Sequence, residues 1–384
     1  MKKVRLGDIC TVVSGTTPKS HVDKYWNGDK VWITPAEINE DTLFVTDSVR
    51  HISESAVKDS SLKSFPKGTV ILSSRAPIGK TAIAGCEMYC NQGFKNLICS
   101  EKINNLYLLY FLRFRKDYLN SLGRGATFKE ISKGIVENIK VPLPSMDTQI
   151  QIGNRIRTIE KLIGLRKKQL FLLDDLIKSR FVEMFGLPNK NKYGFEISHI
   201  GDVVCDVHYG TSKKATEHGK FTYIRMNNIT YNGELNLTDT KKISVSENEI
   251  IGCAVKKGDI LFNRTNSREL VGKTCVFNQD EPMIIAGYII RLRMNGRVLP
   301  EYLSTFLNLS CSKKMLMKMA KGAVGQANIN SQEVQSIMIL VPPIEIQNCF
   351  QQIVHHIDKS KLAVQKSLEE LETLKNSLMQ QYFD

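Results

Sequence analysis

The chain repeats the stretch Lys67–Leu72, which reads KGTVIL, as Lys257–Phe262, which reads KGDILF. Two shorter motifs recur in the same order: LGDI at residues 6–9 returns as IGDV at 200–203, and IGKT at 78–81 returns as VGKT at 271–274. The offset between matched points varies from 190 to 200 residues, as expected when loops differ in length and the framework is shared. The sequence therefore predicts one domain that is present twice.

Each copy of the domain ends in a Val-Pro pair, at residues 141–142 and 341–342, and a long charged segment follows each pair. These segments carry apolar residues at intervals of seven, which predicts two supercoiled helices rather than straight surface helices. About 38 residues at a rise of ~1.5 Å would form a rod of ~57 Å, longer than a domain of this size can cover. That length favours a coiled coil over the alternative, two amphipathic helices packed separately on their own domains.

The predicted seam of this coiled coil has five positions in each helix: Ile156, Ile163, Leu170, Ile177, Met184, Phe350, Ile357, Val364, Leu371 and Leu378. A second seam consists of Ile152, Ile159, Leu173, Ile346, Ile353 and Leu374. Four polar residues interrupt the pattern and are expected to fix the register at some cost in stability: Arg166, Arg180, Ser360 and Ser367. Because each helix follows one domain, the helices can pair only antiparallel, with the domains at opposite ends.

Both copies mix short apolar or β-branched runs with one clear helix, so the predicted fold class is α+β. We expect two repeated mixed α/β domains separated by two long helices that form an antiparallel coiled coil. The expected strands lie at residues 31–33, 69–72, 81–84, 96–99, 223–224, 260–262, 274–277 and 288–292, and the expected helices at 105–119 and 300–318. The predicted boundaries are 1–144 for the first domain, 145–186 for the first helix, 187–343 for the second domain and 344–384 for the second helix.

The formal net charge of +14 and the pI near 9.2 favour a polyanionic partner, because neutralised phosphates release their counterions. A generally basic soluble protein is the alternative. Nine cysteines without a Cys-x-x-Cys pair indicate a reducing compartment, and Cys86, Cys90 and Cys99 lack the further ligands of a zinc site. No apolar run approaches the ~20 residues of a membrane span, and the N-terminus lacks the apolar region of a signal peptide. We therefore expect a cytoplasmic protein with no metal of its own.

The sequence shows no catalytic constellation. The Gly-Lys-Thr motifs at 79–81 and 272–274 look like the end of a phosphate-binding loop, but the glycine needed five positions earlier is replaced by Ser74 and Ser267. Turns that enter a strand explain these glycines better. A dinucleotide fingerprint is missing, as is the Asn-Pro-Pro or Asp-Pro-Pro segment of amino-methyltransferases, and the seven histidines are scattered. We predict that the chain alone catalyses no reaction.

Both domains carry loops with the residue types that bind DNA. Each domain opens with a loop, at 14–19 and 209–214, whose hydroxyls, amides and lysines suit phosphate oxygens. Later loops supply arginine, which reads guanine, and asparagine or glutamine, which read adenine. The candidate DNA contacts are Thr16, Thr17, Lys19, Arg75, Asn91, Gln92, Lys95, Arg124, Thr127, Thr211, Lys213, Lys214, Arg225, Asn227, Asn228, Arg264, Asn266, Arg268, Gln326 and Asn328. Ordinary solvated loops are the alternative at each position. Because the loops differ between the domains, we expect different half-sites.

Several segments together carry a family resemblance: RLGDI at 5–9, SGTTP at 14–18, WITP at 32–35, NQGFK at 91–95 and the Val-Pro exits. The most specific is QLFLLDDLIKSRFVEMFG at 169–186, with a degenerate copy, LETLKNSL, at 371–378. Over essentially its full length, the chain resembles the specificity subunit of a type I restriction-modification system. The second domain departs from the pattern at its Val-Pro-Pro exit, residues 341–343, and in its opening loop.

The resemblance implies two target recognition domains that read a bipartite, asymmetric sequence of double-stranded DNA, with the helices as spacers. It also implies two methyltransferase subunits docked on the chain and two motor-nuclease subunits. These partner subunits, and not this chain, would bind S-adenosylmethionine, ATP and magnesium. Leu162 and Leu172, apolar positions outside the seam, are candidates for partner contact, with helix packing as the alternative. Two other functions stay open: the recognition half of a split or fused methyltransferase-nuclease, and a coiled-coil adaptor that binds protein.

Overall fold

The duplicated motifs form equivalent strands in the two copies of the domain. KGTVIL and KGDILF lead into one strand, and the Gly-Lys-Thr motifs turn into its antiparallel neighbour: β6 (Val70–Leu72), β7 (Thr81–Ala84), β16 (Ile260–Asn263) and β18 (Thr274–Val276). Gly79 and Gly272 have φ angles of +91° and +80°, which glycine adopts without steric cost. The predicted role of these glycines as turns into a strand is confirmed.

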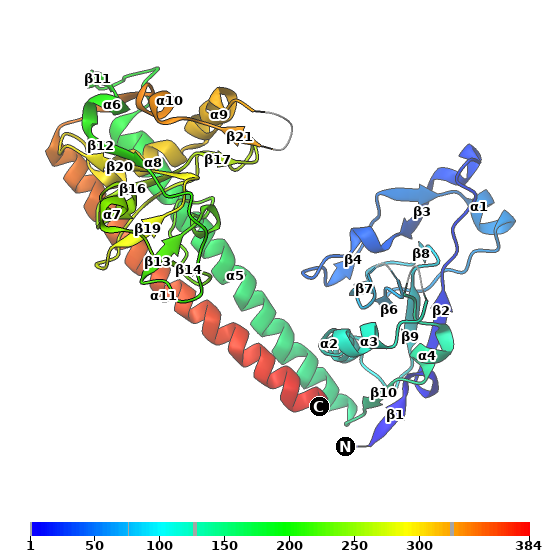
Figure 1. The fold of residues 1–384 in the computed structure, drawn as a ribbon. Coiled ribbons are helices and arrows are strands. Elements are labelled where there is room, and N and C mark those ends of the chain that lie inside the picture. Colours follow the sequence, from blue (N-terminus) through cyan, green and yellow to red (C-terminus); the bar gives the residue numbers. More distant parts are fainter. Residues whose placement is uncertain (1, 76, 126–128, 323–325) are drawn as a thin grey trace. The chain divides into compact units, whose positions relative to one another are not determined.

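The computed structural model describes residues 2–75, 77–125, 129–322 and 326–384. These residues divide into two units, Met1–Arg166 with Ser367–Asp384, and Lys167–Lys366. Each unit contains one domain and one half of each long helix, and Figure 1 labels the elements.

Short strands dominate the first domain. They are β1 (Lys3–Arg5), β2 (Cys10–Ser14), β3 (Trp26–Ile33), β4 (Phe44–Val45), β5 (Arg50–Ile52), β6, β7, β8 (Tyr89–Cys90), β9 (Lys95–Cys99) and β10 (Lys140–Pro142). They form a sheet in the order β2-β9-β6-β7-β4, a smaller sheet in the order β5-β3-β8 and the pair β1-β10. The helices are η1 (Leu6–Asp8), η2 (Asp23–Tyr25), η3 (Pro35–Glu37), α1 (Glu54–Asp59), α2 (Asn105–Phe114), α3 (Lys116–Ser121) and α4 (Lys133–Glu137).

The second domain repeats this plan with its own loops. Its strands are β11 (Glu196–His199), β12 (Val204–Tyr209), β13 (Phe221–Ile224), β14 (Lys241–Ile243), β15 (Ala254–Val255), β16, β17 (Thr265–Asn266), β18, β19 (Met283–Ile285), β20 (Ile289–Met294), β21 (Ala327–Asn328) and β22 (Met338–Val341). They form sheets in the orders β12-β20-β16-β18 and β14-β13-β19-β15 and the pairs β11-β22 and β17-β21. The helices are α6 (Ile200–Val203), η4 (Met226–Asn228), α7 (Glu247–Cys253), α8 (Pro300–Asn308), α9 (Ser310–Met319) and α10 (Ser331–Gln335).

The helix predicted in each domain packs on its sheet, α2 on β7 and α8 on β18, but both helices are shorter than predicted. The first is interrupted at Arg115, which leaves the α conformation and donates through Nη2 to Phe383 O at 2.9 Å. The second is interrupted at Leu309, which is extended and buried in the core. Apolar residues continue at helical spacing across both interruptions, so the sequence pattern did not predict where the helices end.

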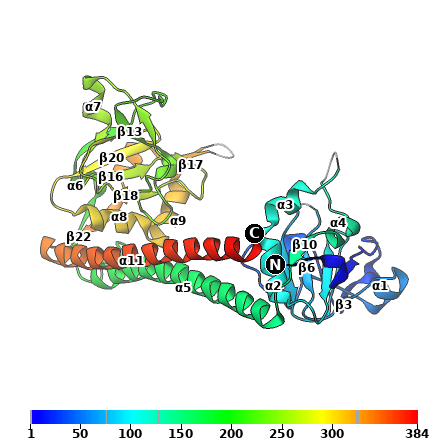
Figure 2. The ribbon, with the colours of Figure 1, turned by 90° about the horizontal axis from the view of Figure 1, so that it is seen from below.

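The two long helices, α5 (Met146–Phe185) and α11 (Ile344–Phe383), lie side by side in each unit (Figure 2). In the first unit Lys375 Nζ lies 2.8 Å from a Glu160 carboxylate oxygen, and in the second the rings of Phe181 and Phe350 are 5.5 Å apart. Contacts of early α5 with late α11, and of late α5 with early α11, make the pair antiparallel. The predicted fold class is confirmed.

The predicted seam residues differ in burial. Those of α5 that lie in the first unit are buried, namely Ile152, Ile156, Ile159 and Ile163, as are Phe350, Ile357 and Val364 of α11. Half-buried seam residues are Leu170, Leu173, Ile177, Met184, Ile346, Ile353, Leu371 and Leu378, and Leu374 is exposed. Phe181, Phe185 and Phe383 are fully buried in the domain cores, where the heptad pattern did not place them.

The expectation that Arg180 and Ser360 fix the register was wrong, because both are exposed. The neighbouring Lys361 is buried instead; it lies 2.6 Å from Asp174 of α5 and also contacts Glu234 of the second domain. In the first unit Glu160 of α5 accepts from Tyr110 at 2.9 Å and pairs with Arg113 at 3.4 Å and Lys375 at 2.8 Å. Each unit thus has one ionic cluster that joins both helices to the domain.

A buried glutamine joins each domain to the first turn of the helix that follows it. Gln149 Oε1 accepts from the backbone amide of Asn104, which precedes α2, and its Nε2 donates to Lys102 O and Pro144 O. Gln347 repeats all three bonds, with the amide of Leu299 before α8 and with Arg297 O and Pro342 O. All six distances lie between 2.8 and 3.1 Å.

Candidate nucleic-acid interface

The opening loop of the first domain packs against the segment that follows β8. The amide of Thr16 donates to Cys90 O at 3.0 Å, and Trp32 Nε1 donates to Thr16 O at 3.2 Å. A Cβ at Gly15 would lie only 2.2 Å from Asn91 O, so only glycine permits this approach. The Thr17 hydroxyl bonds Gln92 Oε1. Four candidate residues, Thr16, Thr17, Asn91 and Gln92, therefore meet at one place.

Arg75 lies beside this loop because backbone bonds connect three segments. The Ser74 amide donates to Gly93 O at 2.7 Å, and the Ile131 amide donates to Ser74 O at 3.0 Å. Arg75 and Arg124 both form β-bridges with Glu130, whose carboxylate lies 3.9 Å from Arg75 Nη1. The candidates of the first domain therefore come together from four separate parts of the sequence.

Lys95 stands apart from this surface. Lys95 is buried and lies 3.0 Å from Glu130 and 3.4 Å from Ser74 Oγ, so it supports the loops from behind. Its predicted role as a DNA contact is not compatible with that position. Thr127 lies outside the described residues. Lys19 and Arg124 are exposed.

The second domain docks its opening loop in the same way. The Thr211 amide donates to Ile285 O at 2.9 Å, and a Cβ at Gly210 would lie 2.2 Å from the same oxygen. Lys213 of this loop pairs with Glu249 at 2.6 Å, a contact that, with Ser246, lowers the pKa of Glu249 to about 2. Lys214 is exposed. A Gly-Thr pair thus fixes the start of the loop in both domains.

Arg264 occupies the position that Ser74 holds in the first domain. Its amide donates to Tyr288 O at 2.9 Å, and its carbonyl accepts from the Ile329 amide at 2.9 Å. The next residues form β17, which pairs with β21 and so brings Asn266 beside Ala327 and Thr265 beside Asn328. Arg264, Asn266 and Asn328 therefore lie together. Gln326 is the exposed residue just before β21.

The remaining candidates of the second domain already have protein partners. Arg225 pairs with Asp239 at 3.1 Å, Asn227 donates to the same carboxylate at 3.4 Å, and Arg268 donates to Met317 O at 3.4 Å. Asn228 is buried and donates to Asn236 O and Asp239 O, so its predicted DNA contact is wrong and its role is to close the loop.

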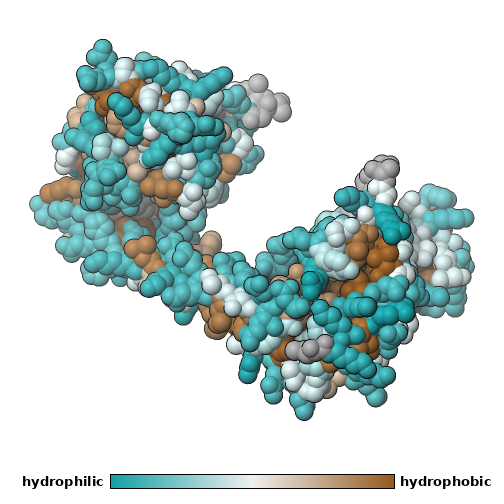
Figure 3. All heavy atoms as spheres, turned by 60° about the horizontal axis from the view of Figure 1, so that its bottom comes forward, coloured by the Kyte–Doolittle hydropathy of each residue, from teal (hydrophilic) through white to brown (hydrophobic). Residues whose placement is uncertain are grey.

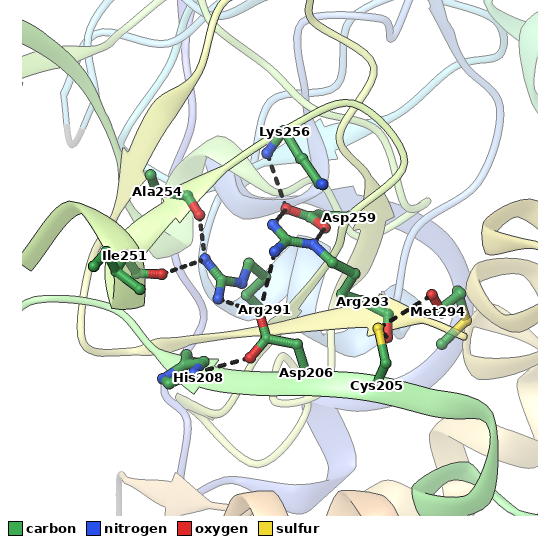
Figure 4. A network of polar contacts seen from close by, with 10 residues as sticks. All are labelled: Cys205, Asp206, His208, Ile251, Ala254, Lys256, Asp259, Arg291, Arg293 and Met294. Carbon is green, nitrogen blue, oxygen red and sulfur yellow. Dashed lines mark hydrogen bonds and ion pairs between the residues drawn. The ribbon is translucent and has the colours of Figure 1, made fainter. Parts of the chain in front are cut away.

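A charged network fixes strand β12, which leads into the second opening loop (Figure 4). Arg291 of β20 is buried and lies 2.6 Å from Asp206 of β12, and it also donates to Ile251 O and Ala254 O at the end of α7. Arg293 binds Asp259 through two bonds of 2.7 and 2.8 Å, and the Asp259 contact raises the pKa of Arg293. In the sequence, the alternation of Ile, Arg, Leu and Arg at 290–293 is the pattern that could have indicated two arginines on one face of this strand.

The surface of the molecule is mainly hydrophilic on the face in Figure 3, with hydrophobic patches between. Phe171 and Leu172 of α5 are 60% and 54% exposed, and Leu162 is 41% exposed. Among the described residues, no group of three or more His, Cys, Asp or Glu side chains could hold a metal ion, and no helix is long and apolar enough to cross a membrane.

The family model described as "Type I restriction modification DNA specificity domain" matches residues 1–172 and 193–373, which is most of the chain and both copies of the repeat. The chain belongs to this family. The type I restriction enzyme MjaIX specificity subunit of Methanocaldococcus jannaschii is 31% identical over 282 residues, which cover 65% of each chain. The EcoKI specificity subunit of Escherichia coli is 23% identical over 98% of this chain and 86% of its own length.

The fold agrees with a solved member of the specificity family. The S subunit from M. genitalium superposes with a TM-score of 0.57 at 14% identity, over 100% of this chain and 96% of that one. Sequence patterns pointed to the opening loops and to Arg75 and Arg264. They did not predict the role of Trp32, which bonds Thr16 O, or that of Tyr209, which stacks on Arg264, because the partners of these contacts are not neighbours in the sequence.

Proposed function

We propose that this chain is the non-catalytic DNA-recognition subunit of a type I restriction-modification complex. Each domain reads one half of a bipartite target in double-stranded DNA, and the helices set the gap between the halves. The observation that supports this proposal most directly is the pair of equivalent loop clusters. The same backbone bonds hold Ser74 and Arg75 in one domain and Arg264 and Thr265 in the other. A shared frame with different side chains suits two readers of different sequences.

The net charge of +14 supports DNA as the partner, because counterion release favours a basic surface at phosphates. Lys19, Lys214 and Arg124 are exposed and suit phosphate contact, whereas Lys95 and Asn228 support the loops from within. The proposed DNA contacts are therefore Thr16, Thr17, Lys19, Arg75, Asn91, Gln92, Arg124, Thr211, Lys213, Lys214, Arg225, Asn227, Arg264, Asn266, Arg268, Gln326 and Asn328.

We assign catalysis to partner subunits. Two methyltransferase subunits would bring S-adenosylmethionine, and two motor-nuclease subunits would bring ATP and magnesium, in the cytoplasm. The exposed Phe171, Leu172 and Leu162 of α5 offer apolar area for methyltransferase docking, and such exposed apolar residues commonly mark an interface. The ionic clusters around Glu160 and Lys361 support the spacer role, because each holds a domain and both helices in one arrangement.

A domain exchange tests this proposal. Residues 1–142 are replaced by the first domain of another specificity-family chain, the hybrid is assembled with the methyltransferase subunit, and methylated sites are mapped across a genome. We expect one half-site to change while the other half-site and the gap stay the same. A hybrid that changes both half-sites would contradict separate readers, and methylation or cleavage by the isolated, homogeneous chain would contradict the non-catalytic role.

A further inference from the structure

The side chain of Arg264 stacks on Tyr209, and no described protein group accepts a hydrogen bond from its Nε. Its guanidinium carbon lies 4.7 Å from the centre of the Tyr209 ring, within the range of a cation–π contact. Nε is buried without a hydrogen-bond partner, and no carboxylate pairs with this guanidinium anywhere in the described part of the chain. A guanidinium held by stacking alone keeps its donors available for a ligand.

Tyr209 is in turn fixed from its other end. Its hydroxyl donates to Ser331 Oγ at 2.9 Å and accepts from the Ser331 amide at 2.8 Å. Ser331 lies two residues after Ile329, whose amide donates to Arg264 O at 2.9 Å. The contacts therefore form a closed circuit through Tyr209, Ser331, Ile329 and Arg264. Such a circuit lowers the conformational entropy that the arginine would lose on binding.

Three other arginines near the recognition loops have protein partners. Arg75 faces Glu130 at 3.9 Å, Arg225 pairs with Asp239 at 3.1 Å, and Arg268 donates to Met317 O at 3.4 Å. In the first domain the position equivalent to Arg264 is the buried Ser74. Of these four arginines, Arg264 is the one that stacks on an aromatic ring, and no described acceptor bonds its buried Nε.

We propose that Arg264 reads a guanine in the second half-site and that Tyr209 is the positioning residue that orients it. The inference rests on the proposed function. Guanine presents two acceptors, O6 and N7, on its major-groove edge, and the guanidinium fork matches them with two parallel bonds. Adenine presents a donor in place of O6, so the same fork would leave one of its own donors facing another donor.

The test measures base preference in the full chain assembled with its methyltransferase subunit. Bound duplexes are selected from a library in which the wild-type target is randomised one position at a time. For Arg264→Ala we expect the preference for guanine at one position of the second half-site, roughly 5- to 150-fold in the wild type, to fall to about 1. Tyr209→Leu should reduce the same preference by roughly 2- to 30-fold, whereas Tyr209→Phe keeps the ring and most of the preference.

Two matched variants separate base reading from folding. Tyr231→Leu alters another exposed tyrosine of the same domain and should leave every base preference unchanged. Arg264→Lys keeps the charge, so it should retain non-specific DNA affinity while the guanine preference falls. If Arg264→Ala leaves all preferences intact, or relaxes only the first half-site or a base other than guanine, the inference is overturned. A wild-type complex without any base preference would instead overturn the proposed function.

Discussion

Lys361 of α11 lies 2.6 Å from Asp174 of α5, and its ammonium group also contacts Glu234 of the second domain. Burial alone would lower the pKa of Lys361, but the bonds to Asp174 and Glu234 outweigh burial and raise it. The lysine side chain is 8% exposed and that of Asp174 is 12% exposed. The cluster therefore has two carboxylates that depend on one buried cation.

Replacing Lys361 by Met should destabilise the second unit by about 2–4 kcal/mol, because the largely buried Asp174 and the partly exposed Glu234 would lose their cation. Chemical denaturation measures the change, and Lys359→Met, an exposed lysine of the same helix, is the control and should change stability by less than about 0.5 kcal/mol. Equal midpoints for the two variants would show that the cluster contributes nothing.

Glu249→Gln should strengthen DNA binding. The substitution releases Lys213 from its 2.6 Å ion pair, and glutamine can still complete the capping box with Ser246. We expect higher affinity for all sequences and a dependence of log K on log salt that is steeper by about one, since one more phosphate is neutralised. Glu247→Gln removes the same charge from the same helix without freeing Lys213, so an equal gain there would assign the effect to net charge.

The second unit should become more stable between about pH 7 and pH 10. Burial, with help from Lys178 and Lys273, lowers the pKa of Lys313 from 10.5 to about 7. In this range the unfolded chain keeps the proton and the folded chain does not, so stability rises with pH, by up to ~1.4 kcal/mol per pH unit. Denaturation across this range should lose that slope in Lys313→Met and keep it in Lys314→Met; a flat wild-type profile would contradict the lowered pKa.

Adding one heptad to each helix, after Leu170 in α5 and after Val364 in α11, should widen the gap in the target. The insertion points face each other in the register given by Glu160 with Lys375 and Asp174 with Lys361. Seven residues add ~10 Å, or about 3 base pairs, with a rotation of roughly 100° that should lower affinity. A methylation map should show unchanged half-sites and a gap longer by about 2–4 base pairs.

An insertion in α5 alone is the control for this experiment. It breaks the register of the ionic clusters and should abolish activity rather than lengthen the gap. An unchanged gap in a folded, active double insertion would rule out the helices as the spacer.

Sequence patterns predicted the repeat, the fold class and the long helices because each depends on local periodicity or on matched motifs. They gave the main seam of the two helices, since Ile156, Ile163, Phe350, Ile357 and Val364 are buried as predicted. They misplaced the second seam of α11 by one residue, because Lys361 is buried and Ser360 is exposed. A seven-residue repeat drifts against a helix of 3.6 residues per turn, so packing against the domains decides which side chain faces inward.

Residue type alone could not separate DNA contacts from loop supports. Lys95 and Asn228 have the chemistry of a DNA contact, yet both are buried because tertiary contacts supply acceptors for their donors. The role of Tyr209 was not predicted for a similar reason, since its partner Arg264 lies 55 positions away in the sequence. Neither fact is encoded in a local pattern.

The matching bonds of Gln149 and Gln347 join each domain to its long helix through backbone groups of the domain. Each glutamine bonds one backbone amide and one carbonyl at the start of the domain helix, α2 or α8. Its third bond goes to the carbonyl of a proline at the end of the domain, Pro144 or Pro342. Backbone groups of this kind exist whatever the side chains are. A foreign domain with the same helix start can therefore form these bonds at the junction whatever its side chains are, so this part of the junction allows domains to be exchanged.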